Sequence, residues 1–301
     1  MKNLSLAALA LLSTSAMATD ARVAAHQGNA GMKDSTDYRT YVSTTNNGPD
    51  SVFFDLDNTG TGVLSGAYKA GGNSLTLSQN ATGDATEIGY YAADGDTGYG
   101  VGLEVINMES FGLSGMYGTT SGDTDMTYGG AINKTADDIG IMVGVASREL
   151  TKKDVTTWSA GLSHSEFGQV IGADYGMGWR FGGDRSKAAV TVGPDLVVTM
   201  PEGADMDIAL SLASANIAGE FALNDWFGLR GSVVSDFMVV DPTGELDLAT
   251  SGVSSMFGAS MDFEGADLDL VIDPNSIMNG PFFLTGAASA PAVMMSARFD
   301  I

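Results

Sequence analysis

From Ser51 to its end, the chain is built of short segments in which apolar side chains alternate with small or polar ones. The clearest segment covers residues 205–212, where Met206, Ile208, Leu210 and Leu212 alternate with Asp205, Asp207, Ala209 and Ser211. Similar segments cover residues 139–145, 157–162, 226–233 and 267–272. A period of two predicts β-strands that have one apolar face and one polar face.

Turn-forming residues separate these segments. Gly, Asn, Asp or Pro gather at residues 70–73, 94–96, 121–123, 182–184, 224–225, 242–244 and 264–267. Gly, Asn and Asp readily adopt the positive φ that tight hairpin turns need. No stretch combines sustained helical spacing with a cap, so the pattern predicts a meander of antiparallel hairpins.

Three features favour a transmembrane barrel over a soluble all-β fold. Short turns at similar spacing are what an up-and-down barrel requires. The non-apolar face is mostly Gly, Ser, Ala, Thr and Asp, which suits a wet interior. Aromatic residues fall near strand ends, as in the interfacial girdles of outer-membrane barrels: Tyr90, Tyr91, Tyr128, Tyr175, Trp179, Phe181, Trp226, Phe227, Phe282 and Phe283. A soluble secreted β-protein remains the alternative, and it predicts partition into the soluble fraction without detergent.

The length of the chain predicts the size of this all-β, up-and-down antiparallel transmembrane barrel. About 250 residues follow residue 50, and a strand with its turn takes roughly 18–20 of them. We therefore expect about 14 strands, within a range of 12–16. Such a barrel is wider than one of eight strands, which its own side chains fill, so a lumen is expected. The predicted units are a signal peptide at residues 1–18, an N-terminal segment at 19–50 that can plug the lumen, and the barrel at 51–301.

The first residues have the three parts of a secretory signal peptide. Lys2 supplies an early positive charge, residues 4–12 are Leu, Ala and Ser, and Ala16-Met17-Ala18 forms an A-x-A site. The apolar run is shorter than the roughly 20 residues that a membrane-spanning helix needs. We expect cleavage after Ala18, export, and a location in the bacterial outer membrane, because only helices and closed barrels span lipid.

The net charge of the chain limits the classes of partner that it is expected to bind. Its formal net charge is −23, which argues against nucleic acid, whose binding needs Lys and Arg opposite phosphates. It also argues against docking on anionic membrane surfaces. The chain has no Cys, so backbone pairing and burial alone must close the fold. The negative charge of the chain can attract cations through its electrostatic field.

The last residues resemble the C-terminal assembly signal of outer-membrane barrels. Val293, Met295, Ala297, Phe299 and Ile301 alternate there with Met294, Ser296, Arg298 and Asp300. Those signals usually finish on Phe or Trp, whereas this chain has Ile301 at the end and Phe299 two residues before it. The resemblance implies that Phe299 and Ile301 form an assembly signal, and that the barrel-assembly machinery and outer-membrane lipid are partners.

A looser resemblance links both ends of the chain to barrels of the long-chain fatty acid transporter (FadL-type) group. It is carried by residues 21–25, Gly28-Asn29-Ala30, residues 37–39, residues 269–274 and residues 280–286. In that group an N-terminal segment precedes the strands and can plug the lumen. The Asn-Pro-Ala stretch often seen near the start of that group is missing here, and the resemblance carries over no substrate or site residue.

Acidic residues out of phase with apolar neighbours are the candidate site. They are Asp205, Asp207, Glu245, Asp247, Asp267 and Asp269. A charge on the lipid face costs about 2–4 kcal/mol at midplane for Lys or Arg and less for acids, so we expect these carboxylates to face the lumen. A carboxylate-lined pore prefers cations. The alternative is that they lie at strand ends near the rim and serve solubility.

No catalytic residue, metal site or cofactor is expected, and the chain is not predicted to be an enzyme. Asp55-Leu56-Asp57-Asn58-Thr59-Gly60 resembles the first half of a calcium loop, but Gly66 stands where the bidentate acid belongs. His164-Ser165 comes without a Gly-x-Ser-x-Gly elbow anywhere in the chain.

The sequence thus predicts an outer-membrane channel that passes small, cation-preferring solutes by diffusion. A FadL-like transporter of hydrophobic molecules, its lumen blocked by residues 19–50, is one alternative. A non-conducting structural or surface-interaction barrel is another. The solute, the oligomeric state and the loop partners are left open.

Overall fold

The computed structural model describes residues 27, 29–32, 37–46, 50–57, 63–80, 85–107, 110–135, 138–166, 168–183, 186–201, 207–236, 239–240, 246–247, 253–272 and 293–301. The predicted signal peptide, Asp205, Glu245 and residues 280–286 lie outside these ranges. Within the described residues, no helix has the length and apolar character needed to cross a membrane.

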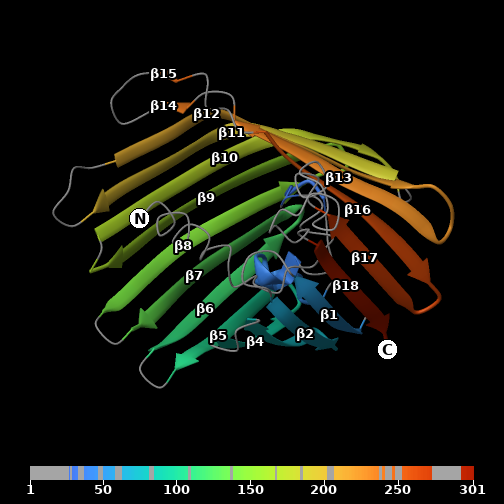
Figure 1. The fold of residues 1–301 in the computed structure, drawn as a ribbon, viewed down its shortest axis with the longest axis horizontal. Coiled ribbons are helices and arrows are strands. Elements are labelled where there is room, and N and C mark those ends of the chain that lie inside the picture. Colours follow the sequence, from blue (N-terminus) through green and yellow to red (C-terminus); the bar gives the residue numbers. More distant parts are fainter. Residues whose placement is uncertain are drawn as a thin grey trace, which may run out of the picture.

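Antiparallel strands form one closed sheet (Figure 1). In chain order they are β1 (Ser51–Asp57), β2 (Val63–Ala70), β3 (Asn73–Asn80), β4 (Thr86–Asp94), β5 (Thr97–Asn107), β6 (Ser110–Ser121), β7 (Thr124–Lys134), β8 (Ile139–Leu150), β9 (Asp154–Ser165), β10 (Gly168–Gly182), β11 (Ser186–Pro201), β12 (Asp207–Ala222), β13 (Phe227–Asp236), β16 (Val253–Phe263), β17 (Ala266–Ile272) and β18 (Val293–Asp300). Each strand pairs with its neighbours in this order, and β1 pairs with β18 to close the ring.

The barrel has 16 strands, two more than the 14 expected from length. The reason is that turns at one end are very short, as at Gly71-Gly72, Gly95-Asp96 and Gly122-Asp123. Gly71, Gly95 and Gly122 have φ between 56° and 61°, the backbone conformation for which glycine was expected in these turns. A further hairpin, β14 (Val239–Val240) and β15 (Leu246–Asp247), pairs with β12 outside the ring.

The two ends of the barrel differ. Ser51, where β1 begins, and Asp300, where β18 ends, are paired in register. The short turns after β2, β4 and β6 lie at this same end, which we call the turn end. The opposite end, which we call the loop end, carries longer connections such as those after β1, β3 and β17. Outer-membrane barrels commonly have short periplasmic turns and longer extracellular loops.

The strands present an apolar face outward and a small or polar face inward. Leu64, Val101 and Ile139 point outward and are more than half exposed, whereas Ser74 and Thr76 point inward and are buried. Aromatic side chains gather on the outer face toward the turn end: Tyr68, Tyr99, Tyr117, Tyr128, Trp179 and Phe181. Tyr91, expected in this girdle, points inward and is buried, and Phe282 and Phe283 lie outside the described residues. An apolar outer face and a polar inner face suit a barrel in lipid.

Candidate functional site: the barrel lumen

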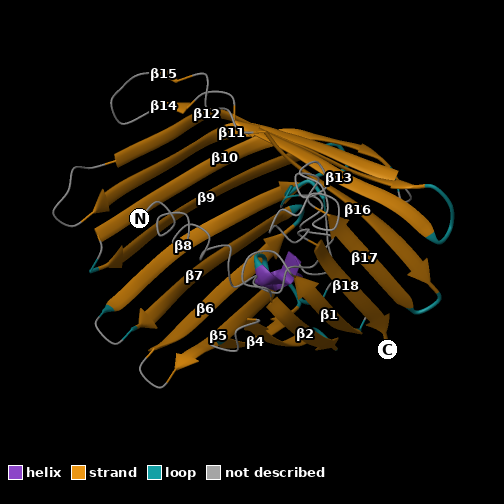
Figure 2. Cartoon of the chain, viewed as in Figure 1, coloured by secondary structure: helices purple, strands orange, loops and turns teal. Residues whose placement is uncertain are grey.

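The N-terminal part of the chain lies inside the barrel. We call residues 27, 29–32 and 37–46 the lumen segment. It includes two short 3-10 helices, η1 (Asp37–Arg39) and η2 (Val42–Thr44), which Figure 2 shows in the space enclosed by the strands. Tyr38, Val42 and Thr45 are completely buried, and η2 contacts β4, β5, β6 and β7. The segment is therefore packed against the inner wall.

Glycines in the wall make room for Val42. A Cβ on Gly98 would lie 2.3 Å from the Val42 carbonyl oxygen, and one on Gly118 would lie 2.8 Å from Val42 Cγ1. Any larger residue at Gly98 would displace the segment, since the three nearest atoms all belong to Val42 and Ser43. Close approach of two backbones is a common reason for glycine in a strand.

Tyr38 is held by the neighbouring strands. Its ring meets Tyr91 edge to face, with centroids 5.3 Å apart, and its hydroxyl accepts a hydrogen bond of 2.9 Å from Ser74 Oγ. The ammonium group of Lys69 lies 5.8 Å from the Tyr38 ring centroid. These contacts tie η1 to β2, β3 and β4.

Arg148 makes a charged contact between the wall and the lumen segment. Its guanidinium lies 2.8 Å from Asp37 of the segment and 3.0 Å from Asp125 of β7. The same group lies 4.2 Å from the centroid of the Tyr41 ring. Only 2% of Arg148 is exposed, and a charge so deeply buried needs partners of this kind.

The surroundings of Tyr41 raise the pKa of its phenol group. Burial raises the pKa of Tyr41 to about 12, and the carboxylates of Asp37, Asp125 and Asp174 act in the same direction, while Arg148 opposes them. A phenol in this setting stays neutral at any physiological pH.

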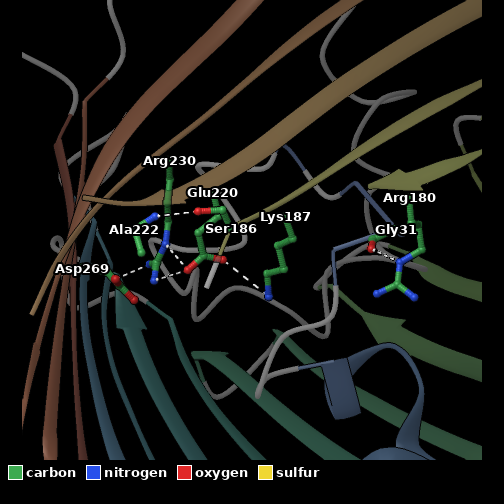
Figure 3. A network of polar contacts seen from close by, with 8 residues as sticks. All are labelled: Gly31, Arg180, Ser186, Lys187, Glu220, Ala222, Arg230 and Asp269. Atoms are coloured by element: carbon green, nitrogen blue, oxygen red, sulfur yellow. Dashed lines mark hydrogen bonds and ion pairs between the residues drawn. The ribbon is translucent and has the colours of Figure 1, made fainter. Parts of the chain in front are cut away.

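Hydrogen bonds fix the start of the segment to the other side of the lumen. Asn29 donates to the backbone oxygen of Asn216 at 3.0 Å, and Arg180 Nε donates to the Gly31 oxygen at 2.8 Å (Figure 3). Gln27 accepts from Ser254 Oγ at 2.6 Å. Together with the contacts of η1 and η2, these bonds join the segment to opposite sides of the inner wall.

Two of the predicted acids lie on the inner wall in ion pairs. Asp269 pairs with Arg230, which also contacts Glu220 at 3.0 Å (Figure 3). Asp267 pairs with Arg298. Lys187 adds a contact of 3.5 Å to Glu220. These carboxylates are thus locally balanced by arginine, which the alternation pattern alone did not indicate.

The other predicted site residues are not brought together with this pair. Asp207 begins β12. Asp247 ends β15, on the hairpin outside the ring. The side chains of both, like Asp205 and Glu245, lie outside the described residues. The row of six carboxylates therefore stays a prediction.

The predicted assembly signal ends the barrel wall. Phe299 is 45% exposed and points outward, and the Ile301 amide donates to the Asp50 oxygen at 3.1 Å. The last residues of the chain therefore lie on the strand that closes the ring.

Inward-facing bases in the described wall all lie near the turn end, within four residues of it: Lys69, Arg148, Arg180, Lys187, Arg230 and Arg298. The sequence reasoning missed them, although their phase signals the inner face in the same way as that of the acids. Farther from the turn end, the charged side chains that the structure describes on the inner wall are acidic, including Glu87, Glu104, Asp174 and Asp195. The lumen thus has an asymmetric charge along its axis.

A cavity of about 630 Å³ lies between the lumen segment and the wall formed by β6 to β12. Asn29, Asp37 and Tyr41 line it from the segment, and Thr127 and Asp174 line it from the wall. Its volume is in the range of small-molecule sites.

Comparison with known proteins supports the fold. No protein-family model matches the chain, and no curated protein matches it. A bacterial polysaccharide outer membrane secretin matches with a TM-score of 0.52 and 10% identity, over 83% of this chain and 97% of that one. CdiB from Acinetobacter baumannii matches with a TM-score of 0.44 and 12% identity over 84% of this chain, which spans 60% of the length of CdiB. A mutant Rh. blastica porin matches with a TM-score of 0.42 and 11% identity, over 84% and 99%.

Two of these neighbours are described as an outer membrane secretin and a porin. At such identities the likeness concerns the fold alone, and the match to the secretin supports a closed antiparallel β-barrel. The comparisons give no support to the resemblance to the FadL-type group.

Proposed function

We propose that this chain is an outer-membrane channel for small polar solutes, and that its lumen segment is a plug. The observation that carries the proposal is the cavity of about 630 Å³ that lies between that segment and an inner wall of mostly small or polar side chains. The outer face, by contrast, exposes large apolar side chains along the strands. This combination suits a solute path through lipid.

The strand number supports a path through the barrel. Barrels of eight strands are filled by their own side chains, whereas barrels of 16–18 strands leave an aqueous channel. The ring here has 16 strands. Many inward positions carry only glycine or a small side chain, such as Gly144, Gly161 and Ser163 on β8 and β9, so the wall itself does not fill the space.

The contacts of the lumen segment support its role as a plug. Arg148 and Gly98 hold it on one side, and Asn216 and Arg180 hold it on the other. The segment also reaches the turn end, where Asn46 Nδ2 donates to the Gly95 oxygen at 3.1 Å. These contacts restrict passage near the turn end and leave the cavity on the loop side.

A transporter of hydrophobic molecules is the second candidate that the sequence suggests, and the position of the lumen segment favours it too. Its lumen would need apolar surface. Most inward side chains that meet the cavity are small or polar, with Met116 of β6 an exception. We therefore favour polar solutes.

Planar-bilayer recording tests both parts of the proposal. The purified full-length mature protein is compared with Gly98→Val, whose side chain would collide with Val42. Gly115→Val is the matched control, because a Cβ at that outward position meets nothing within 4 Å. We expect rare openings for the wild type and the control, and frequent stepwise conductance for Gly98→Val.

Two results would contradict the proposal in different ways. Silence of all three proteins, each shown to be folded by its heat-modifiable mobility in gels, would refute the channel and favour a structural barrel. Equally frequent conductance steps in all three proteins would refute the role of the lumen segment as a plug and would still support a channel.

A further inference from the structure

We propose that the cavity binds an uncharged, hydroxyl-rich solute, such as a small sugar. The inference rests on the proposed channel function and names the class of solute that the channel takes. Three features of the cavity carry it: a flat floor of glycines, neutral hydroxyl and amide groups around that floor, and charged side chains of both signs, which favour neither a cation nor an anion.

The floor of the cavity is a row of four glycines. Gly129, Gly144, Gly161 and Gly172 are direct cross-strand partners on β7, β8, β9 and β10, and all four line the cavity. Neighbouring strands lie about 4.8 Å apart, so the row extends over roughly 14 Å. Glycine in a strand often marks a place where a ligand approaches the backbone closely. This flat, apolar surface suits the C–H faces of two linked sugar rings.

Neutral hydroxyl and amide groups surround this floor. Ser159 and Thr157 of β9 line the cavity on the side of the turn end. Thr191 of β11 and Asn216 of β12 line it farther around the wall, and Asn29 lines it from the lumen segment. A hydroxyl group both donates and accepts hydrogen bonds, and a side-chain amide offers groups of both kinds. A solute rich in hydroxyl groups therefore finds donors and acceptors on several sides.

The hydroxyl group of Thr157 faces the cavity. Its Oγ1 lies over Gly176, its direct partner on β10, because a Cβ on Gly176 would be 2.6 Å from that oxygen. Both residues line the cavity, and Gly176 has no side chain that could cover the hydroxyl. Ser159 lies between Thr157 and Gly161 on the same face of β9, over a distance of roughly 13 Å along the strand. A solute of two rings that extends from the floor toward the turn end thus meets both hydroxyl groups.

The charged side chains of the lining do not favour one sign of solute charge. Arg39 and Arg148 line the cavity together with Asp37, Asp174 and Asp195. Arg148 lies 2.8 Å from Asp37, and Ser159 donates a hydrogen bond to Asp174. A charged solute would be attracted by some of these groups and repelled by others, and it would lose its hydration on entry. An uncharged solute avoids this cost, and its hydroxyl groups can still bond to carboxylates and guanidinium groups.

The same lining disfavours a hydrophobic solute. Such a molecule would remove water from the hydroxyl and amide groups of the wall without replacing their hydrogen bonds, which costs free energy. The cavity volume of about 630 Å³ falls within the range for small-molecule sites. A glycine floor bordered by neutral polar groups matches a solute that has flat C–H faces and hydroxyl groups at its edges.

Isothermal titration calorimetry on the folded full-length mature protein tests the inference independently of conduction. The detergent must have no sugar headgroup, because such a headgroup would compete with the probes. The probes are cellobiose, its diamino analogue chitobiose and its carboxylate analogue cellobiouronate, which share two linked rings and differ in charge. At mildly acidic pH, where the amines are charged, we expect cellobiose to bind at least tenfold more tightly than either charged analogue.

Two pairs of variants locate the site. Gly129→Val fills the floor, and a Cβ there would make only ordinary contacts, the nearest at 3.6 Å from the Gly115 oxygen. We expect it to abolish detectable binding of cellobiose, whereas Gly115→Val, on the outer face, should leave binding unchanged. Thr157→Val should weaken binding several-fold, whereas Thr156→Val, at the neighbouring outward position on β9, should not. Heat-modifiable mobility of each variant separates loss of the site from loss of the fold.

Three results would overturn the inference. They are tighter or equal binding of a charged analogue, the absence of cellobiose binding to the folded wild type, and cellobiose binding that survives both Gly129→Val and Thr157→Val. The bilayer recordings remain a separate readout. A conducting protein that binds none of the probes keeps the channel and loses this solute class, whereas a silent protein that binds cellobiose selectively keeps the site and loses the channel.

Discussion

Asp37 of the lumen segment lies 2.8 Å from Arg148 of β8, where the guanidinium also meets Asp125 at 3.0 Å. Arg148 is the more deeply buried of the two, and Asp37 is the partner that can be changed without touching the wall. A substitution at Asp37 can therefore weaken the binding of the lumen segment to the wall without disrupting the fold of the barrel.

Asp37→Ala should loosen the segment and leave the barrel intact. Arg148 keeps Asp125 as a partner, so the change should weaken seating by about 1–3 kcal/mol, and each 1.4 kcal/mol is a factor of ten in the open population. Single-channel recording should show openings at least several-fold more frequent. Glu149→Gln, which changes an exposed acid on β8 that does not touch the segment, is the control. An unchanged opening frequency for Asp37→Ala would show that this pair does not hold the plug.

Alkaline pH should weaken the seating of Tyr41. Its pKa is raised to about 12 by burial first and by Asp37, Asp125 and Asp174, against the opposing effect of Arg148. The seated segment favours the neutral phenol, so this contribution is complete below the ordinary pKa near 10 and is lost as pH rises from 10 toward 12. Difference absorbance titration of the wild type against Tyr41→Phe should reveal, among nine tyrosines, one that ionises near pH 12. A difference curve centred near pH 10 would contradict the packing described for Tyr41.

Arg230→Met should destabilise the barrel. Arg230 is buried and faces both Glu220 and Asp269, so its removal takes away the guanidinium that both buried carboxylates contact, although Lys187 still lies 3.5 Å from Glu220. Breaking a buried pair in this way costs about 3–5 kcal/mol. Urea unfolding in lipid vesicles measures the loss. Arg298→Met is the matched control, because its pair with Asp267 is about a fifth exposed, and its expected cost is about 1 kcal/mol. Equal costs for the two variants would argue against the burial of the Arg230 network.

A charged residue on the outer face should destabilise the barrel more in the middle of a strand than near a strand end. Val143 lies in the middle of β8, points outward and is 52% exposed. Val143→Arg should cost about 2–4 kcal/mol, whereas Thr156→Arg, outward and close to the turn end of β9, should cost about 0–1 kcal/mol. The same unfolding assay compares them. Similar small costs would indicate that this face does not contact lipid hydrocarbon.

Alternation along the sequence predicted the strands and their faces because the two faces of the wall meet different surroundings. Leu268 and Leu270 point outward while Asp267 and Asp269 point inward. The strand number was underestimated because it depends on how few residues each turn takes. Two-residue turns such as Gly95-Asp96 leave chain for additional strands.

The contents of the lumen could not be predicted in the same way. Phase shows that a charged residue faces inward, but its partner is set by register and barrel curvature. Asp269 and Arg230 lie on strands separated by β16, and Asp37 and Arg148 are far apart in the sequence. The cavity beside Asp174 likewise arises only when the lumen segment and the wall are both in place.

The pairing of β1 with β18 also determines the order of events during assembly. Val52 lies opposite Phe299, so the ring stays open until the C-terminal strand has been made and exported. Until then the sheet has two free edges, which could join another chain instead. The lumen segment precedes β1 in the chain, and Asp50 lies at this seam, where its backbone oxygen accepts a hydrogen bond from the Ile301 amide. The pairing of β1 with β18 is therefore the last step in forming the wall. The same step encloses the lumen segment within the barrel.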